Sequence, residues 1–150
     1  MDMKVTMMLA DHVQVADGKL FVSGGGWTWI NVGAPFGIAL LVEVPWDRLN
    51  EKHKLRLELV DADGQPVSVA GPSGDQPVLI EGEFVGGRPA EHVPGTPLMM
   101  PVPFNVGGGM PLDPGQRYRW QLTIDGESRE DWTLAFSTRQ AVPGAQVQAG

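Results

Sequence analysis

Cysteine is absent from this chain of 150 residues, and long apolar runs are absent as well. Without thiols the chain cannot form a disulfide framework, a zinc–thiolate site or a thiolate nucleophile, and this composition fits a reducing cytoplasm. The longest apolar run, Ile38–Val42, falls far short of the ~18 residues that a membrane-spanning helix requires. We therefore predict a cytoplasmic protein that does not insert into membranes.

Positive charge is scarce. Eleven Lys and Arg residues stand against eighteen Asp and Glu, which gives a formal net charge of −7. The densest cationic run, 52–56, is flanked by Glu51 and Glu58, so it is typical of a solvated strand edge. A nucleic-acid-binding protein needs a basic face, and the phosphate backbone is repelled by net negative charge. We therefore expect no nucleic-acid partner.

Hydrophobic residues make up 42% of the chain, and Gly and Pro are frequent, with 20 and 13 residues. This hydrophobic share is too high for a disordered protein, while the Gly and Pro content indicates many loops. The length is typical of one domain with a substantial core. We expect a single domain over 1–140 and a flexible C-terminal tail over 141–150, where the residues are small and polar.

Short β-type segments recur between turn signals. Asp17-Gly18 separates two apolar runs, which predicts that 12–16 and 19–23 pair as a hairpin. Phe36–Val44 is almost entirely apolar, as expected of a central strand. The segment 71–77 reads as a loop, and one or two helical turns are expected within 45–53. The other expected strands are 4–9, 27–32, 55–60, 65–70, 78–85, 98–106, 117–124 and 131–139.

Many short strands with almost no helix predict an all-β fold. We expect an antiparallel two-sheet β-sandwich of immunoglobulin-like or jelly-roll-like type. In the strand 98–106, Pro101 and Pro103 lack backbone donors and lie on the same side, which suits an edge strand.

Two segments resemble known families. Leu112–Gly126 resembles the penultimate-strand region of immunoglobulin-like and fibronectin-type-III-like sandwiches, where a Pro-Gly turn precedes a strand with an inward-facing tyrosine, here Tyr118. The cysteine pair of antibody domains is missing. Met8–Leu20, with the Gly24–Trp27 run, is similar to a family of short uncharacterised bacterial proteins. That resemblance implies an origin in bacteria, with actinobacteria as the group it suggests, and brings no activity.

Three local motifs fail on spacing. The run from Gly24 lacks the glycines of a dinucleotide fingerprint, because Trp29 stands where the third glycine is required. Asp61–Gln65 begins like a calcium loop but has Pro66 at the glycine position. Gly71–Asp75 lacks the second glycine of a nucleophile elbow. We therefore assign no catalytic residue, no cofactor and no metal ligand.

The three histidines leave an enzymatic alternative open. His12, His53 and His92 lie in different segments and form no close-spaced pair. A hydrolase or metalloenzyme would have to assemble them with carboxylates in a noncontiguous site.

Five tryptophans are many for this length. Trp120 and Trp132 lie on alternating apolar faces and are expected in the core. The possible interface or ligand contacts, for which a core position is the alternative, are Trp27, Trp29, Trp46, Met99 and Met100.

The leading functional hypothesis is a non-enzymatic association module. It would self-assemble as a homo-oligomer or bind a protein partner in a larger complex, with the 86–96 and 107–114 loops as reaching arms. The alternative is a small-ligand or carbohydrate-binding protein that uses Trp27 and Trp29, so a glycan is the second type of partner considered.

Overall fold

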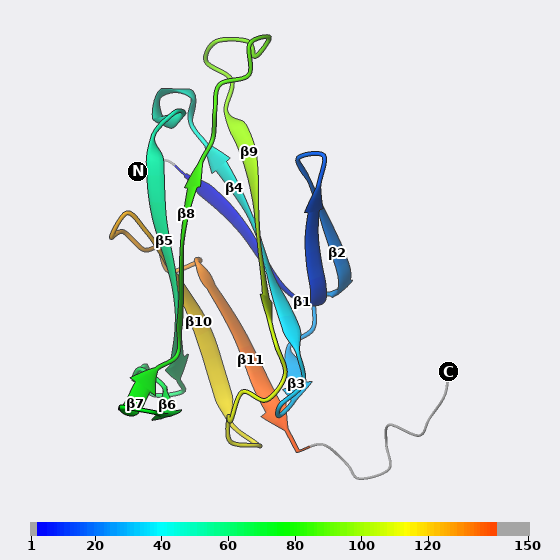
Figure 1. The fold of residues 1–150 in the computed structure, drawn as a ribbon, viewed down its shortest axis with the longest axis vertical. Helices are drawn as coiled ribbons and strands as arrows, with labels where there is room; N and C mark the ends of the chain where they lie inside the picture. The colour runs from blue at the N-terminus through cyan, green and yellow to red at the C-terminus, as the bar shows by residue number, and fades with distance from the viewer. Residues whose placement is uncertain (1–2, 141–150) are drawn as a thin grey trace.

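The structure, a computed structural model, describes residues 3–140 and confirms the all-β class (Figure 1). The predicted tail, 141–150, lies outside the described residues. Within 3–140 the only helical segment is a 3-10 helix at Trp46–Arg48, inside the expected 45–53. The strands are β1 (Lys4–Ala16), β2 (Lys19–Gly25), β3 (Trp29–Asn31), β4 (Phe36–Val44), β5 (Lys52–Asp61), β6 (Ser68–Gly71), β7 (Gly74–Pro77), β8 (Leu79–Val85), β9 (Leu98–Val106), β10 (Arg117–Ile124) and β11 (Thr133–Arg139).

The predicted N-terminal hairpin is present. β1 and β2 pair antiparallel, and their register includes Ala16 opposite Lys19 and His12 opposite Ser23. The turn residues Asp17 and Gly18 have φ values of 52° and 69°. Positive φ at both positions is the conformation of a type I′ turn, which Asp-Gly favours. The expected strands 4–9 and 12–16 are in fact one strand, because β1 continues through Ala10 and Asp11 without a break.

β4 lies inside the first sheet, whose order is β2-β1-β4-β9. The first half of β1 pairs with β4, and the second half pairs with β2. β9 pairs antiparallel with β4 and forms the other edge, as expected from Pro101 and Pro103. β4 is therefore the central strand that its apolar sequence predicts.

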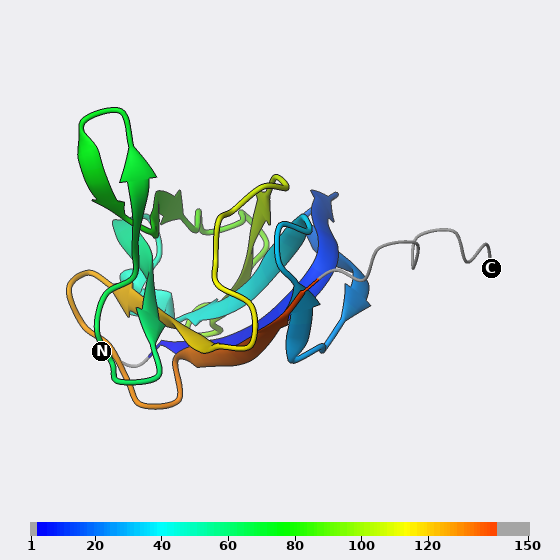
Figure 2. The same cartoon turned by 90° about the horizontal axis from the view of Figure 1, so that it is seen from below.

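The second sheet has the order β3-β11-β10-β5-β8 and corrects one expectation. Its β3–β11 pair is parallel, with Ser137 opposite Trp29 and Arg139 opposite Asn31, whereas the sequence predicted only antiparallel pairing. The chain leaves β2, adds the short β3 at the edge beside β11, and then continues into β4 of the other sheet. Figure 2 shows how strongly the strands curl.

One apolar core takes buried side chains from both larger sheets. Alternate residues of β5 and β10 face inward, and the predicted core residues Trp120 and Trp132 are almost fully buried. The first sheet contributes Leu9 and most of β4 to the same cluster. The finer expectation, a sandwich of immunoglobulin-like or jelly-roll-like type, stays a prediction.

A second correction concerns 71–77, which is not a loop. β6 and β7 pair antiparallel in a separate hairpin that projects from the molecule (Figure 2). Gly71 and Gly74 face each other at its tip, where Gly74 adopts a φ of 105°. A side chain on Gly71 would meet the Gly74 carbonyl oxygen and Gln76, so the glycine permits the close turn.

Candidate functional site

Trp27 and Trp29 are close in sequence but have different surroundings. The expected strand 27–32 is shorter than predicted, because β3 covers only Trp29–Asn31. Trp27 packs against the core, with ring centroids 6.2 Å from Phe36 and 6.5 Å from Phe136 in edge-to-face geometry. Trp29 is 45% exposed. Only Trp29 therefore offers a large aromatic surface to a ligand or partner.

A pocket of about 280 Å³ opens beside Trp29. Both tryptophans line it, together with the Asn31 side chain and an apolar wall of Ile30, Ala34 and Pro35. The remaining lining residue is Asp11, which comes from β1 in the other sheet. The sequence analysis did not associate Asp11 with the tryptophans, because the two segments meet only in the folded chain.

Gly24 makes room for the carboxylate of Asp11. Its φ is 62°, and a Cβ atom placed there would collide with the Asp11 carboxyl group. Any other L-residue would meet both the unfavourable conformation and the clash. Within the glycine-rich run before Trp27, a glycine is thus required at position 24, because it accommodates Asp11 at the pocket.

Arg139 fixes the exposed tryptophan from the neighbouring strand. Its guanidinium carbon lies 3.9 Å from the centroid of the Trp29 ring, in cation–π geometry. The parallel β3–β11 pairing places Arg139 opposite Asn31. The aromatic ring is therefore held in place before any ligand arrives.

Trp46 serves as an anchor for the 86–97 loop. The Arg88 guanidinium carbon lies 4.2 Å from the centroid of the Trp46 ring, and Arg88 also donates a hydrogen bond to the Trp46 carbonyl. On the same loop, His92 stacks on Trp46 with a centroid distance of 5.8 Å. The loop expected to be a reaching arm is thus tied down at Trp46, although Val93 in it is highly exposed.

Met99 and Met100 point in opposite directions, as neighbours on a strand must. Met99 is 46% exposed, whereas Met100 is partly buried against the core. Of the two, Met99 is the residue that a partner could contact. The second expected arm, 107–114, also packs on the body of the molecule, since Met110 and Leu112 contact the core.

β2 carries an exposed apolar surface that the sequence analysis did not identify as a site. Phe21 is 53% exposed and Val22 is 37% exposed. Because successive residues of a strand point to opposite faces, each face of β2 shows one of them. The Asp-Gly turn predicted the hairpin, but only the strand order places β2 at the edge of the sheet.

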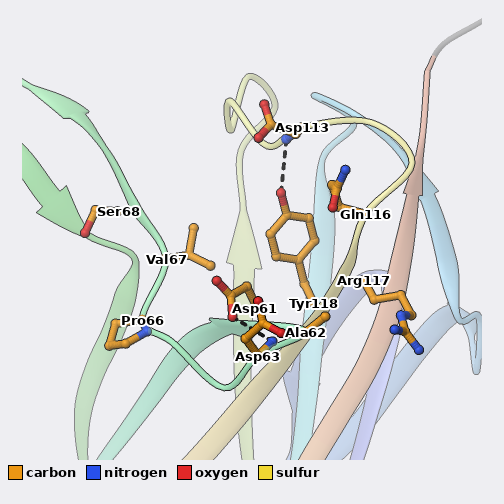
Figure 3. A pocket seen from close by; sticks show the side chains of 10 residues that line it. All are labelled: Asp61, Ala62, Asp63, Pro66, Val67, Ser68, Asp113, Gln116, Arg117 and Tyr118. Carbon is orange, nitrogen blue, oxygen red and sulfur yellow. Dashed lines mark hydrogen bonds between the residues drawn. The ribbon is translucent and has the colours of Figure 1, made fainter.

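A polar pocket of about 330 Å³ lies where the turn after β5 meets the start of β10 (Figure 3). Two of its polar side chains, those of Asp61 and Tyr118, bind local backbone. Asp61 accepts hydrogen bonds from the backbone N–H groups of Asp63 and Gln65, and the Tyr118 hydroxyl accepts one from the Asp113 N–H at 3.1 Å. These contacts stabilise the turns. Tyr118 itself is buried in the core, and the immunoglobulin-like resemblance of its segment stays a prediction.

The buried His53 pairs with the partly exposed Asp125. His53 Nδ1 lies 2.7 Å from Asp125 Oδ2, and its Nε2 lies 3.0 Å from the Arg48 carbonyl oxygen. Burial opposes ionisation of Asp125, but the hydrogen bonds from His53 and from the Lys54 N–H, with the charges of His53 and Arg48, outweigh it. The net result is a lowered pKa for Asp125. Both His53 nitrogens are engaged by the fold.

The other histidines lie apart from this pair. His12 is on β1, and His92 is in the loop that covers Trp46. Among residues 3–140, no group of three or more His, Asp or Glu side chains is arranged to hold a metal ion. The same part of the chain contains no helix of sufficient length and apolarity to cross a membrane.

The comparisons with known proteins identify a family but no activity. A family model described as a family of unknown function, DUF6941, matches residues 5–137, which is most of the chain. No curated protein matches the sequence.

Proposed function

Because the chain belongs to the family of unknown function DUF6941, which supplies no activity, we propose a function from the geometry. The protein is a non-enzymatic association module that pairs with a second copy of itself through the outer edge of β2. The observation that carries this proposal is that β2 presents an extended apolar edge without the features that block strand addition on the other edges.

The other edge strands of the two larger sheets are each protected. β9 carries Pro101 and Pro103, which lack the N–H groups that a further strand would need. β8 carries the charged side chains of Glu81 and Glu83, and β3 has only three residues. Prolines, charges and short length are the usual means by which edge strands avoid pairing with other chains.

β2 has no proline along its seven residues and only one charged side chain. Its single charged side chain, Lys19, lies at the turn end, and Ser23, Gly24 and Gly25 leave the backbone uncovered. The two residues that flank a two-residue turn, here Ala16 and Lys19, form a hydrogen-bonded pair across the hairpin. Alternation then directs the N–H groups of Leu20 and Val22 toward the outer edge. An added strand would find both donors and acceptors there.

A second copy is the occupant that this strand fits best. Each face of β2 exposes one large apolar side chain, Phe21 or Val22, and an identical strand would bring apolar surface to both faces. In an antiparallel two-fold pair, Lys19 of each β2 strand lies at the Gly25 end of the other, so the charged side chains of β2 do not face each other. An isologous pairing of this kind closes after two copies, as two-fold symmetry requires.

Light scattering after size exclusion tests the proposal. We expect a mass of twice the 16.2 kDa of the chain at high protein concentration. Phe21→Lys adds a charge to the edge, and Val22→Pro removes an outward N–H group, so both variants should shift the protein to the monomer. Met99→Lys is the matched control, because it adds the same charge at a similarly exposed position on the opposite edge.

Two results would contradict the proposal. One is a wild-type protein that stays monomeric across the concentration range. The other is a dimer that Phe21→Lys and Val22→Pro leave intact. Folding of each variant is checked by near-ultraviolet circular dichroism, which reports on the buried Trp120 and Trp132.

A further inference from the structure

The pocket beside Trp29 combines an exposed aromatic ring with polar groups that make no hydrogen bond to the rest of the described chain. Neither the Asp11 carboxylate nor the Asn31 amide has a hydrogen-bond partner or an ion pair within residues 3–140. The pocket is thus a concave, partly apolar site, and two solvent-exposed polar side chains at its wall are free to bind a ligand. From this arrangement we propose that the pocket binds a single neutral pyranose ring.

The aromatic part of the site suits the apolar face of a sugar. Trp29 lies on β3, and its ring is fixed by the Arg139 guanidinium at 3.9 Å, so stacking costs little loss of side-chain freedom. Trp27 is held by Phe36 and Phe136 and adds a rigid wall. Tryptophan is well suited to such contacts, because one end of the side chain packs while the other stays wet.

The polar part of the site suits hydroxyl groups. An ionised Asp11 carboxylate only accepts hydrogen bonds, whereas the Asn31 amide both accepts and donates. Vicinal hydroxyls of a sugar can donate hydrogen bonds to the Asp11 carboxylate, and they can both donate to and accept from the Asn31 amide. Asn31 shares a strand face with Trp29, since they are two residues apart, so the stacking surface and the amide face the same ligand.

Charge disfavours an anionic ligand, and a cationic ligand, although Asp11 attracts it, meets Arg139 at the Trp29 ring. An anionic ligand would be repelled by Asp11 and by the net charge of −7. A cationic ligand on Trp29 would approach the guanidinium of Arg139, which already occupies a position over the ring. A neutral ligand avoids both repulsions. The volume of about 280 Å³ lies just below the range of drug-sized pockets, so it fits one ring rather than an oligosaccharide.

Saturation-transfer NMR on the full chain tests the site. The probes are the methyl pyranosides of glucose, galactose, mannose and N-acetylglucosamine, and we expect one of them to bind with a Kd of about 1 mM, as ligand efficiency allows for so small a molecule. Trp29→Ala and Asp11→Ala should each weaken binding by about tenfold or more. Trp29→Phe keeps an aromatic face and should retain part of the affinity.

Two controls keep a loss of binding interpretable. Asp17→Asn removes a charge from the same hairpin at its turn end, and Met99→Ala truncates an exposed apolar side chain on β9. Both variants should bind the sugar like the wild type. The Trp29 and Asp11 variants are checked for folding by the same near-ultraviolet spectrum as the wild type.

Three outcomes would overturn the proposal. The first is that no methyl pyranoside of the panel gives saturable transfer to the wild type. The second is sugar binding that Trp29→Ala leaves unchanged. The third is saturable binding of tetramethylammonium in place of the sugars, lost in the same variants, because that would make the pocket a cation site. Each readout concerns the ligand alone, so it is independent of whether β2 mediates association.

Discussion

Replacing Asp125 by asparagine would isolate the energetic role of its pair with the buried His53. His53 is fully buried, and the atoms facing its two ring nitrogens, Asp125 Oδ2 and the Arg48 carbonyl oxygen, are both acceptors. Both contacts hold the ring in the fold. Asparagine keeps the shape of the side chain and tolerates the φ of 50° at this position, but it removes the negative charge.

The expected loss is about 2 kcal/mol of unfolding free energy. A hydrogen bond to a charged group contributes about 1.5–3 kcal/mol, and breaking a fully buried ion pair costs about 3–5 kcal/mol. The Asp125 side chain is 24% exposed, so water screens it in part. Asparagine also keeps an acceptor for the Lys54 N–H. Both facts favour a loss of about 2 kcal/mol, near the lower end of these ranges. For a domain of this size, that loss lowers Tm by about 6 °C.

The pH dependence gives a second, independent signature. The folded-state pKa of Asp125 is lowered, whereas the unfolded chain has the ordinary value of about 4. The unfolded state therefore binds the proton more readily. The stabilisation from Asp125 is complete above about pH 4 and is lost as the pH falls through the folded-state pKa. The difference in stability between wild type and Asp125→Asn should accordingly shrink in acid.

Urea unfolding followed by tryptophan fluorescence, at pH 7 and at a series of lower pH values, measures both effects. Asp17→Asn is a close control. Asp17 has a φ of 52° and precedes a glycine, as Asp125 does, and its substitution removes the same charge. It lacks an ionic partner among the described residues, so its effect should stay within ~0.5 kcal/mol. If Asp125→Asn behaves like this control at every pH, the pair contributes nothing to stability and the reasoning fails.

Two further substitutions test local features of the fold by the same measurement. Tyr118→Phe removes the acceptor of the Asp113 N–H and should cost about 1 kcal/mol; no change would mean that water replaces the hydroxyl. Gly24→Ala should cost more than ~1 kcal/mol, because it adds strain at positive φ and a clash with Asp11, whereas Gly107→Ala, which meets open space, should be nearly neutral. Equal effects of the two glycine variants would refute the role given to Gly24.

The parts of the fold that could be predicted are those with local signals. Asp17-Gly18 specifies a type I′ turn, and the turn fixes the pairing of β1 with β2. The apolar run of β4 and the prolines of β9 predicted a central and an edge strand in the same way. The 71–77 segment misled because its two glycines and two prolines suggested a loop, whereas they lie at the tip and at one end of the β6–β7 hairpin.

The candidate site depended on contacts that no local pattern encodes. Asp11 reaches the pocket only because β1 and β3, which belong to different sheets, meet beside it. The parallel pairing of β3 with β11 brings Arg139 over Trp29 from more than one hundred residues away. His53 and Asp125 are likewise 72 positions apart. In each case the residue types were visible in the sequence, but the partner was not.

The two proposed activities meet at Gly24. This residue lies next to the end of β2, and the absence of its side chain leaves the space that the Asp11 carboxylate occupies. A strand added along β2 would constrain the same backbone that positions a ligand contact. Trp29 and Asn31, however, lie on β3 in the other sheet, so the stacking surface does not depend on the edge. Association and ligand binding can therefore fail separately, and coupling between them would have to pass through the Asp11–Gly24 contact.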